Sequence, residues 1–231
     1  MILKGKRALV TGGAVRVGKA IVEALQAEGA EVVVHYLASE EEARALSPFV
    51  ARADLSNPDD LATLIEESGP VDILVNNAAL FTKDDLAAAA PERVRREFEV
   101  NLFAPMELTR RFAAQTRAGA VINLLDRRVR ANDPSCLPYS ISKKGLEELT
   151  KLAALDLAPG IRVNAVAPGP ILPPPGSDGT GFAEMAGTVP LELFPTPADV
   201  ADAALYLLKA DYCAGQVIYV DGGQHLLGNG V

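Results

Sequence analysis

Short runs of β-branched and other apolar residues alternate along this chain with longer stretches in which apolar residues recur at helical spacing. A short apolar run bounded by turn residues indicates a buried strand, and a glycine after a periodic stretch indicates the end of a helix. On this basis we predict strands at 7–11, 31–36, 49–53, 71–76, 121–125, 162–168 and 216–220. Helices are expected at 17–28, 40–47, 57–68, 91–115, 138–158 and 197–209.

Strands that alternate with helices imply βαβ units, in which the strands run parallel and helices cover both faces of the sheet. We therefore expect an α/β protein with a Rossmann-type, doubly wound parallel sheet of about seven strands. The 231 residues fit a single domain spanning 1–231, since α/β domains often exceed about 200 residues. No internal repeat or linker interrupts the pattern.

Composition narrows the classes of function. The net charge of −8 argues against a nucleic-acid partner, whose phosphates require a basic surface. No apolar run reaches the roughly 18 residues of a membrane span, and the N-terminus has no signal-peptide pattern. Cys136 and Cys213 lack metal-ligand spacing and are too few for a disulfide framework. We therefore expect a cytoplasmic protein with no metal site and no membrane partner.

The segment at about 169–195 departs from the alternating pattern because it is rich in proline and glycine. Structureless segments of this length inside a domain are commonly lids or binding loops. We interpret it as a loop that covers the substrate. The alternative is a surface excursion without a functional role.

The glycine-rich stretch TGGAVRVG at 11–18 lies between the first predicted strand and the first predicted helix. Gly12 and Gly18 suit a tight turn that approaches a pyrophosphate closely, and the helix N-terminus adds free N–H groups and a positive dipole. This position in a βα turn predicts a dinucleotide site. A plain turn is the alternative.

Two features favour NADP(H) over NAD(H). Arg16 stands where a further glycine is expected, and its guanidinium could bind a 2′-phosphate near the adenosine ribose. The second predicted strand ends in His35, Tyr36 and then LAS, without the acid that commonly binds the ribose hydroxyls of NAD, and Ser39 could donate to a phosphate. The acidic run at 40–42 just beyond argues against a phosphate, unless it serves only as the first turn of a helix.

Two further strand ends add candidate cofactor residues. Asp54 follows the third strand, where it could accept from an adenine amino group or could merely shape the turn before the next helix. The small residues of NNAA at 76–79 would let a cofactor pass over the end of the fourth strand.

The combination resembles the short-chain dehydrogenase/reductase family. The matching pieces run through nearly the whole chain in the family's order: the glycine-rich turn, Asn76-Asn77-Ala78, Asn101, Tyr139 with Lys143, Pro168-Gly169 and Val220-Asp221-Gly222-Gly223. Together with the features above, the resemblance implies a cofactor site made of Gly12, Arg16, Val17, His35, Tyr36, Ser39, Asp54, Leu55, Asn77, Ala78, Tyr139, Lys143, Pro168 and Gly169.

The spacing of Tyr139 and Lys143 places both on one helix face. Reduction of C=O or C=N by hydride needs a proton donor, and a nearby ammonium is expected to lower the tyrosine pKa from about 10 toward working pH. The resemblance implies that Lys143 also binds the nicotinamide ribose and that Asn101 supports a water chain that resupplies protons. Without this setting, the pair would indicate only a solvated helix face.

Asp126 departs from the usual family pattern, which has a serine about thirteen residues before the tyrosine. Within the family, the pteridine reductases have Asp there, and they share the arginine of the glycine-rich turn and the patterns at 35–39, 53–57 and 76–81. A carboxylate could accept from the donors of an amino-pyrimidine ring or relay a proton through Tyr139, and Phe81 could stack on a flat ring. Alternatively, Asp126 shapes a turn or pairs with Arg127, Arg128 or Arg130, and Phe81 is a core aromatic.

Three functions follow from these residues. The first is an NADPH-dependent reductase of a pterin-like C=N bond, with Asp126, Tyr139, Lys143 and Asn101 catalytic and Phe81, Asp126 and Tyr139 contacting the substrate. The second is a carbonyl reductase of the same family, for example of 3-oxoacyl thioesters. The third is a non-catalytic NADP-binding protein. The resemblance also implies a homo-oligomer, with a tetramer favoured, assembled through the helices at 91–115 and 138–158.

Overall fold

The computed structural model describes residues 1–173 and 178–228. Over these residues a parallel sheet of seven strands has the order β3-β2-β1-β4-β5-β6-β7. The strands are β1 (Arg7–Val10), β2 (Glu31–Tyr36), β3 (Val50–Arg52), β4 (Ile73–Asn76), β5 (Gly119–Leu124), β6 (Ile161–Pro168) and β7 (Val217–Val220). The expected doubly wound parallel sheet is confirmed, with strand bounds within three residues of those predicted.

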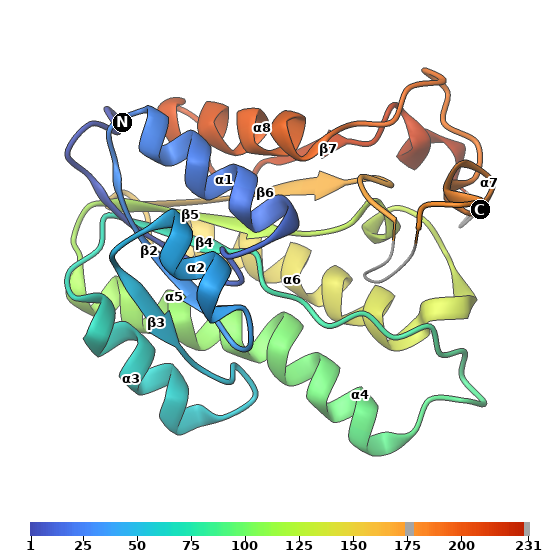
Figure 1. Ribbon diagram of the computed structural model, residues 1–231, viewed down its shortest axis with the longest axis horizontal. Helices are drawn as coiled ribbons and strands as arrows, with labels where there is room; N and C mark the ends of the chain where they lie inside the picture. Colours follow the sequence, from blue (N-terminus) through green and yellow to red (C-terminus); the bar gives the residue numbers. More distant parts are fainter. Residues whose placement is uncertain (174–177, 229–231) are drawn as a thin grey trace.

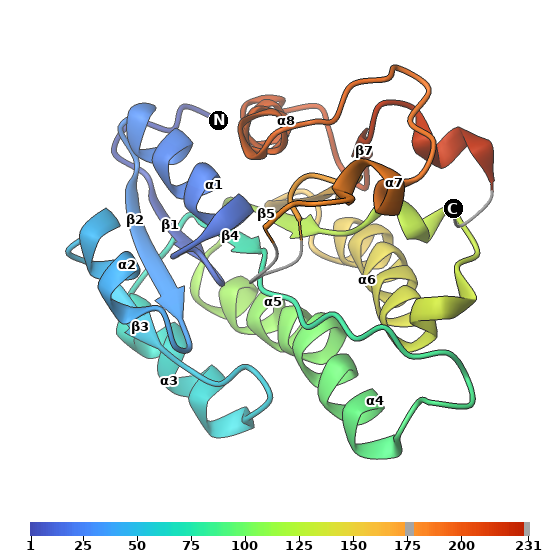
Figure 2. The ribbon, with the colours of Figure 1, turned by 45° about the vertical axis from the view of Figure 1, so that its right-hand side comes forward.

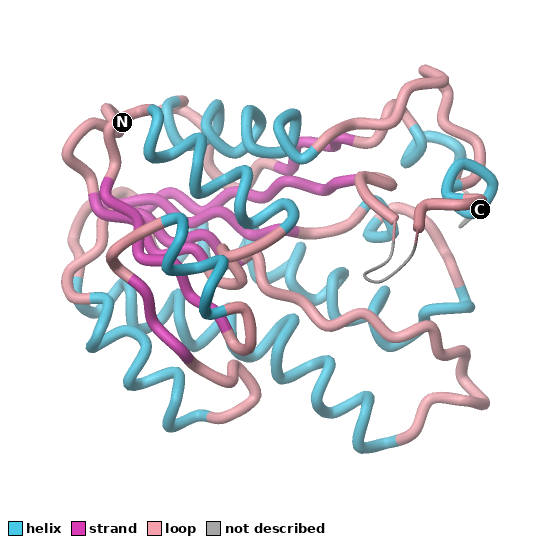
Figure 3. Tube along the Cα trace, in the orientation of Figure 1, coloured by secondary structure: helices cyan, strands magenta, loops and turns pink. Residues whose placement is uncertain are grey.

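Helices cover both faces of the sheet, as Figure 1 shows and as the layers in Figure 3 make plain. On one face lie α1 (Arg16–Ala27), α2 (Glu40–Leu46) and α8 (Pro197–Lys209); on the other lie α3 (Pro58–Ser68), α4 (Pro91–Phe98), α5 (Ala104–Gln115) and α6 (Leu137–Asp156). Neighbouring residues of one strand therefore enter different cores: Ala8 and Val10 pack beneath α1, whereas Leu9 packs toward α3 and α5. Burial on both faces explains why the strands read as unbroken apolar runs.

The predicted helix at 91–115 is not a uniform α-helix. A π-helical turn, η1 (Glu99–Phe103), separates α4 from α5 and contains Asn101. Such turns insert an extra residue into the helical hydrogen-bond ladder and occur frequently at functional sites.

The segment predicted as one loop at 169–195 includes a short helix, α7 (Phe182–Ala186), and residues 174–177 lie outside the described residues. Figure 2 shows this segment beyond the carboxyl end of the sheet, on the same side as the loop that follows β4. Ligands of open α/β sheets bind at this edge, where the strand order reverses between β1 and β4.

No helix among the described residues is both long enough and apolar enough to cross a membrane.

Candidate active site

The glycine-rich turn after β1 is fixed by backbone and side-chain contacts from two neighbouring strands. The Gly12 N–H donates to His35 Nδ1 at 2.9 Å, and Asn77 Nδ2 donates to the carbonyls of Thr11 and Gly12 at 2.9 and 3.0 Å. A Cβ at Gly18 would lie 2.1 Å from the Gly12 carbonyl oxygen, so only glycine fits there. The first turn of α1 carries no acidic residue to oppose an anion at its N-terminus.

His35 is buried and uses both ring nitrogens within the protein. Its Nδ1 accepts from Gly12, so the neutral ring carries its proton on Nε2, which lies 3.1 Å from the Ala53 carbonyl oxygen. Burial lowers the pKa of His35 to about 4. The side chain therefore shapes the predicted phosphate-binding turn from beneath, and its nitrogens do not point at a ligand.

Arg16 adopts a left-handed backbone conformation, with φ of 56°, in the place where the sequence pattern expects glycine. Its guanidinium donates to the carbonyl of Pro173 at 2.8 Å, in the segment that follows β6. In this structure the arginine thus joins the glycine-rich turn to that segment, and a contact between Arg16 and a 2′-phosphate stays a prediction.

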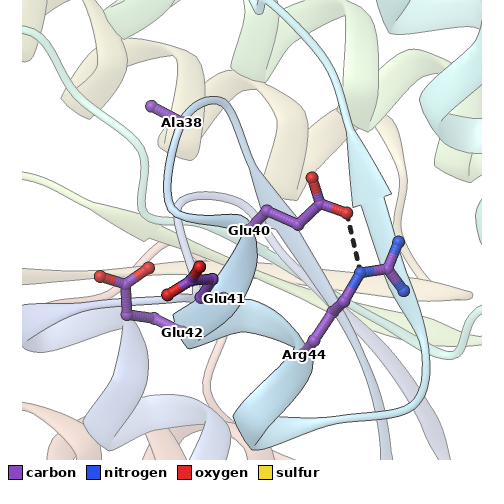
Figure 4. A pocket seen from close by; sticks show the side chains of 5 residues that line it. All are labelled: Ala38, Glu40, Glu41, Glu42 and Arg44. Carbon is purple, nitrogen blue, oxygen red and sulfur yellow. Dashed lines mark hydrogen bonds and ion pairs between the residues drawn. The ribbon is translucent and has the colours of Figure 1, made fainter.

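The end of β2 leads into a surface hollow of about 590 Å³ that Figure 4 shows from close by. It is lined by Ala38, Glu40, Glu41, Glu42 and Arg44. The acids form the first turn of α2, where they complement the helix dipole, and Glu40 accepts from Arg44 at 2.8 Å. Ser39 precedes this helix without a side-chain capping bond, and the adjacent Tyr36 is buried.

Asp54 has the contacts of a turn residue. Its Oδ1 accepts from the Ser56 hydroxyl at 2.6 Å and from the Ser56 N–H at 2.9 Å, and Arg96 pairs with its other oxygen. The Ser56 bonds are the main cause of a lowered pKa of the Asp54 carboxyl. These contacts favour the turn-forming alternative over adenine recognition, and the adjoining Leu55 is buried in the core.

Pro168 ends β6 beside β7, and Gly169 follows it. The Gly169 N–H donates to the Val220 carbonyl at 2.9 Å, and a Cβ at Gly169 would lie 2.7 Å from the Asp221 Cβ. Glycine at this position therefore serves close packing of the two strand ends. Two further predicted cofactor residues lie near the glycine-rich turn. The Ala78 Cα is 3.1 Å from where a Cβ on Gly12 would lie, so these two backbones pack closely. Val17 is half-buried on α1.

Tyr139 and Lys143 lie on α6, as their spacing predicted, and the structure shows both to be buried. The Tyr139 hydroxyl donates to Asp126 Oδ2 at 3.2 Å, and Lys143 Nζ donates to the Leu124 carbonyl at 2.6 Å. Three of the four predicted catalytic side chains thus meet at the ends of β5 and α6.

The expected lowering of the tyrosine pKa by Lys143 is wrong for this structure. Burial, followed by the Asp126 carboxylate, raises the pKa of Tyr139 well above its usual value. Burial also lowers the pKa of Lys143 to about 8. The sequence pattern predicted the pair correctly, but the sign of the shift depends on the desolvation and the carboxylate that the fold adds.

Asn101, in the π-helical turn, is wholly buried and bonds to two other segments. Its Nδ2 donates to the Leu80 carbonyl at 2.8 Å and to the Ser142 hydroxyl at 3.1 Å, while its Oδ1 accepts from the Leu80 N–H at 2.8 Å. The side chain therefore fixes the segment after β4 against α6. Its predicted role in a proton-supplying water chain remains a hypothesis.

Phe81 follows Leu80 and is 51% exposed, so it is not a core aromatic. Its ring lies edge-on to the Tyr139 ring with centroids 4.8 Å apart. A half-exposed ring beside the predicted proton donor is available for stacking on a flat ligand.

Sequence reasoning gave no role to Glu97, a buried carboxyl beside the same segment. Glu97 accepts from the Thr82 N–H and hydroxyl at 2.9 and 2.8 Å, and burial raises its pKa. An acid on an otherwise polar helix gives no sign of burial in the sequence, so this residue could not have been singled out.

Comparison with known proteins identifies the family. A family model described as enoyl-(acyl carrier protein) reductase matches residues 13–225. The chain belongs to the short-chain dehydrogenase/reductase family. The sequence-based expectation of an oxidoreductase from this family is thereby confirmed.

Two kinds of short-chain dehydrogenase/reductase are similar to the chain. The granaticin polyketide synthase putative ketoacyl reductase 2 of Streptomyces violaceoruber is 38% identical over 239 residues, covering 95% of this chain and 96% of that protein. The 3-oxoacyl-(acyl-carrier-protein) reductase FabG of Staphylococcus epidermidis is 34% identical, covering 96% and 99%. The structure of FolM alternative dihydrofolate reductase 1 from Brucella canis, complexed with NADP, matches with a TM-score of 0.91 and 34% identity over 97% and 96% of the two chains.

Proposed function

We propose that this protein is an NADPH-dependent reductase of a pterin-like C=N bond, of the dihydropteridine or dihydrofolate type. The observation that carries the proposal is the position of the Asp126 carboxylate, 3.2 Å from the hydroxyl of Tyr139, where the family usually has a serine. A carboxylate accepts hydrogen bonds from the N–H groups of an amino-pyrimidine ring but repels the lone pairs of a ketone oxygen. The similarity to a FolM alternative dihydrofolate reductase supports the same substrate class.

The residues at the carboxyl edge of the sheet fit a dinucleotide. Gly18 lets the start of α1 pack closely against the Gly12 carbonyl, Asn77 donates to the turn, and the N-terminus of α1 presents N–H groups without an opposing acid. We propose that Gly12, Arg16, Ser39, Ala78 and Lys143 contact NADP(H), in line with the NADP complex of the similar FolM structure. When bound, the cofactor supplies the hydride.

The chain's own groups supply the proton and the orientation of the substrate. Tyr139, kept protonated by burial and by Asp126, donates its proton to the substrate nitrogen as hydride arrives at the neighbouring carbon. Asp126 accepts from a ring N–H and so fixes which edge of the ring faces Tyr139. Phe81 stacks on the exposed face of the ring, and Lys143 binds ribose while its charge stabilises the tyrosinate that proton transfer leaves behind.

The test compares NADPH oxidation with dihydrobiopterin, dihydrofolate and an acetoacetyl thioester, for the native protein and for Asp126→Ser. We expect pterin or folate turnover that falls at least about 100-fold in Asp126→Ser, since a misoriented substrate loses that much rate. Thioester turnover without pterin turnover, kept or improved in Asp126→Ser, would contradict the proposal.

A carbonyl reductase is the second candidate, because a ketoacyl reductase is 38% identical over nearly the whole chain. In that reaction Asp126 would replace the usual serine, and Tyr139 would protonate the carbonyl oxygen. Absence of NADPH oxidation with any of these substrates would instead favour a non-catalytic NADP-binding protein.

We also propose that the protein is a homo-oligomer, with a tetramer favoured. Exposed apolar side chains lie on and beside the two helices that were expected to form the contacts: Phe103, Met106, Leu152 and Leu155. Sedimentation velocity measures the state directly, and a monomer at micromolar concentration would contradict this proposal.

A further inference from the structure

Arg128 is an active-site residue to which the sequence gave no role of its own. It lies in the short helical turn η2 (Arg127–Val129) that follows β5, two residues after Asp126. Its guanidinium Nη1 lies 3.2 Å from both carboxylate oxygens of Asp126, and its backbone N–H donates to Asp126 Oδ1 at 2.8 Å. One residue thus contacts the Asp126 carboxylate through both backbone and side chain.

A second carboxylate fixes the guanidinium itself. Arg128 Nε donates to Asp133 Oδ2 at 2.9 Å, and Asp133 is in turn fixed by the Ser135 N–H and hydroxyl at 3.0 and 2.6 Å. Burial alone would lower the pKa of Arg128, but the Asp126 and Asp133 carboxylates outweigh burial and raise it. The planar guanidinium between two carboxylates cannot be reproduced by an ammonium.

This arrangement turns one oxygen of Asp126, Oδ2, toward Tyr139. Oδ1 accepts from the Arg128 N–H, the guanidinium Nη1 lies 3.2 Å from both oxygens, and Oδ2 also accepts from the Tyr139 hydroxyl. Arg128 also lies beside Phe81, the proposed stacking residue, because its guanidinium carbon is 5.6 Å from the centroid of the Phe81 ring.

We propose that Arg128 is a positioning residue: it fixes the Asp126 carboxylate so that Oδ2 faces Tyr139 and a substrate N–H, and its charge offsets that carboxylate. The inference extends the proposed reductase function and rests on it for the substrate. The electrostatic coupling between Arg128, Asp126 and Tyr139 is independent of which substrate is reduced.

Several other groups face this cluster and are held constant in the test. Lys143 lies on α6 beside Tyr139, Cys136 and Asp133 come from the turn before α6, Arg127 is the neighbour in η2, and Glu97 lies on α4. When these groups are unchanged, a shift in the Tyr139 titration reports the substitution at Arg128 or Asp126.

The first experiment follows tyrosinate absorption after a rapid pH jump, before alkaline unfolding, with Tyr139→Phe subtracted to isolate Tyr139. We expect Arg128→Met to move the Tyr139 titration to higher pH and Asp126→Asn to move it to lower pH, each by about 1 to 2 pH units. Arg130→Met is the matched control, since Arg130 lies next to η2 but its exposed side chain pairs with Glu147 and Tyr219. Equal titrations in Arg128→Met and Arg130→Met would overturn the proposal.

The second experiment measures kcat and KM for pterin reduction. We expect Arg128→Met to lower kcat by about 10- to 100-fold with the KM for NADPH unchanged, as a displaced Asp126 costs orientation. Arg128→Lys retains the charge, so its Tyr139 titration should stay near that of the native protein while kcat recovers only in part. This variant also serves if Arg128→Met does not fold.

The two experiments separate the two proposals. The expected titration shifts with no pterin turnover in the native protein would reject the substrate and keep the role of Arg128. Pterin turnover with no effect of Arg128→Met on either the Tyr139 titration or kcat would keep the substrate and reject the role of Arg128.

Discussion

The Tyr139 hydroxyl donates to Asp126 Oδ2 across 3.2 Å, in a buried position at the carboxyl edge of the sheet. Loss of the tyrosine proton would place a phenolate beside a carboxylate, so the pair favours the protonated phenol. The raised pKa keeps Tyr139 protonated, as a proton donor must be, but the same shift makes the phenol a weaker acid. This pair, the glycine-rich turn with His35 and Arg16, and the buried Asn101 each lead to a testable expectation.

Replacing Tyr139 by Phe removes the only atom that can pass a proton from this side chain. We expect kcat for reduction to fall by about 100- to 10,000-fold, the usual contribution of a general acid, with NADPH affinity changed by less than about threefold. Steady-state kinetics and NADPH fluorescence titration measure the two quantities. The control is Tyr206→Phe, on the exposed surface of α8, which should leave both unchanged.

His35 should make stability depend on acid pH. Its pKa is about 4 in the fold and about 6.5 when unfolded, so between these values the unfolded chain binds more protons. The stabilisation is complete above about pH 6.5 and is lost as pH falls toward 4, amounting to about 2 to 3 kcal/mol. Urea unfolding from pH 7 to pH 4 measures this loss.

His35→Gln is the matched variant for that measurement. A glutamine can accept from Gly12 and donate to Ala53 as the neutral ring does, but it does not titrate. We expect His35→Gln to flatten the pH dependence and keep NADPH binding. His35→Ala leaves the Gly12 N–H without its acceptor and should weaken NADPH binding at least about tenfold. An unchanged acid profile in His35→Gln would contradict this account.

Arg16 should show opposing effects on stability and binding. Arg16→Gly relieves the left-handed backbone at φ of 56°, whereas Arg16→Ala does not, so the glycine variant should be more stable than the alanine variant by about 1 kcal/mol. Both variants lose the contact with the Pro173 carbonyl and, if Arg16 recognises the 2′-phosphate, the preference for NADPH over NADH. Thermal unfolding and the two cofactor affinities measure these effects. If both variants still prefer NADPH over NADH, Arg16 serves only to bind the segment after β6 and does not recognise the 2′-phosphate.

Asn101→Ala removes two hydrogen bonds to Leu80, next to Phe81, and one to Ser142, and it should lower both stability and turnover. We expect a loss of about 2 to 3 kcal/mol in the free energy of unfolding and a fall in kcat of about 10-fold or more. Asn164→Ala is the control, because the side chain of this buried asparagine bonds on the β7 side of the sheet, to Cys213 and Gln216. If both variants lose similar stability but only Asn101→Ala loses kcat, the fall in turnover comes from the active site and not from general destabilisation.

The order of elements and the identity of most site residues could be predicted from the sequence. Strands and helix ends are set largely by local conformation and burial. They can therefore be predicted from short patterns, such as the apolar run EVVVHY or the glycine after α1. The spacing of Tyr139 and Lys143, and the presence of an acid at 126, are likewise local facts that a family resemblance can interpret.

The contacts that decide the chemistry depended on tertiary structure. Asp126 could have paired with Arg127, Arg128 or Arg130, and the turn after β5 selects Arg128 while also bringing Tyr139 within reach. His35 meets Gly12, and Arg16 meets Pro173, because parallel strands bring distant residues to one edge of the sheet. The pKa of Tyr139 rises because packing removes water from it. The local sequence determines which titratable side chains are present in the site, whereas burial and the distances between them determine their pKa values.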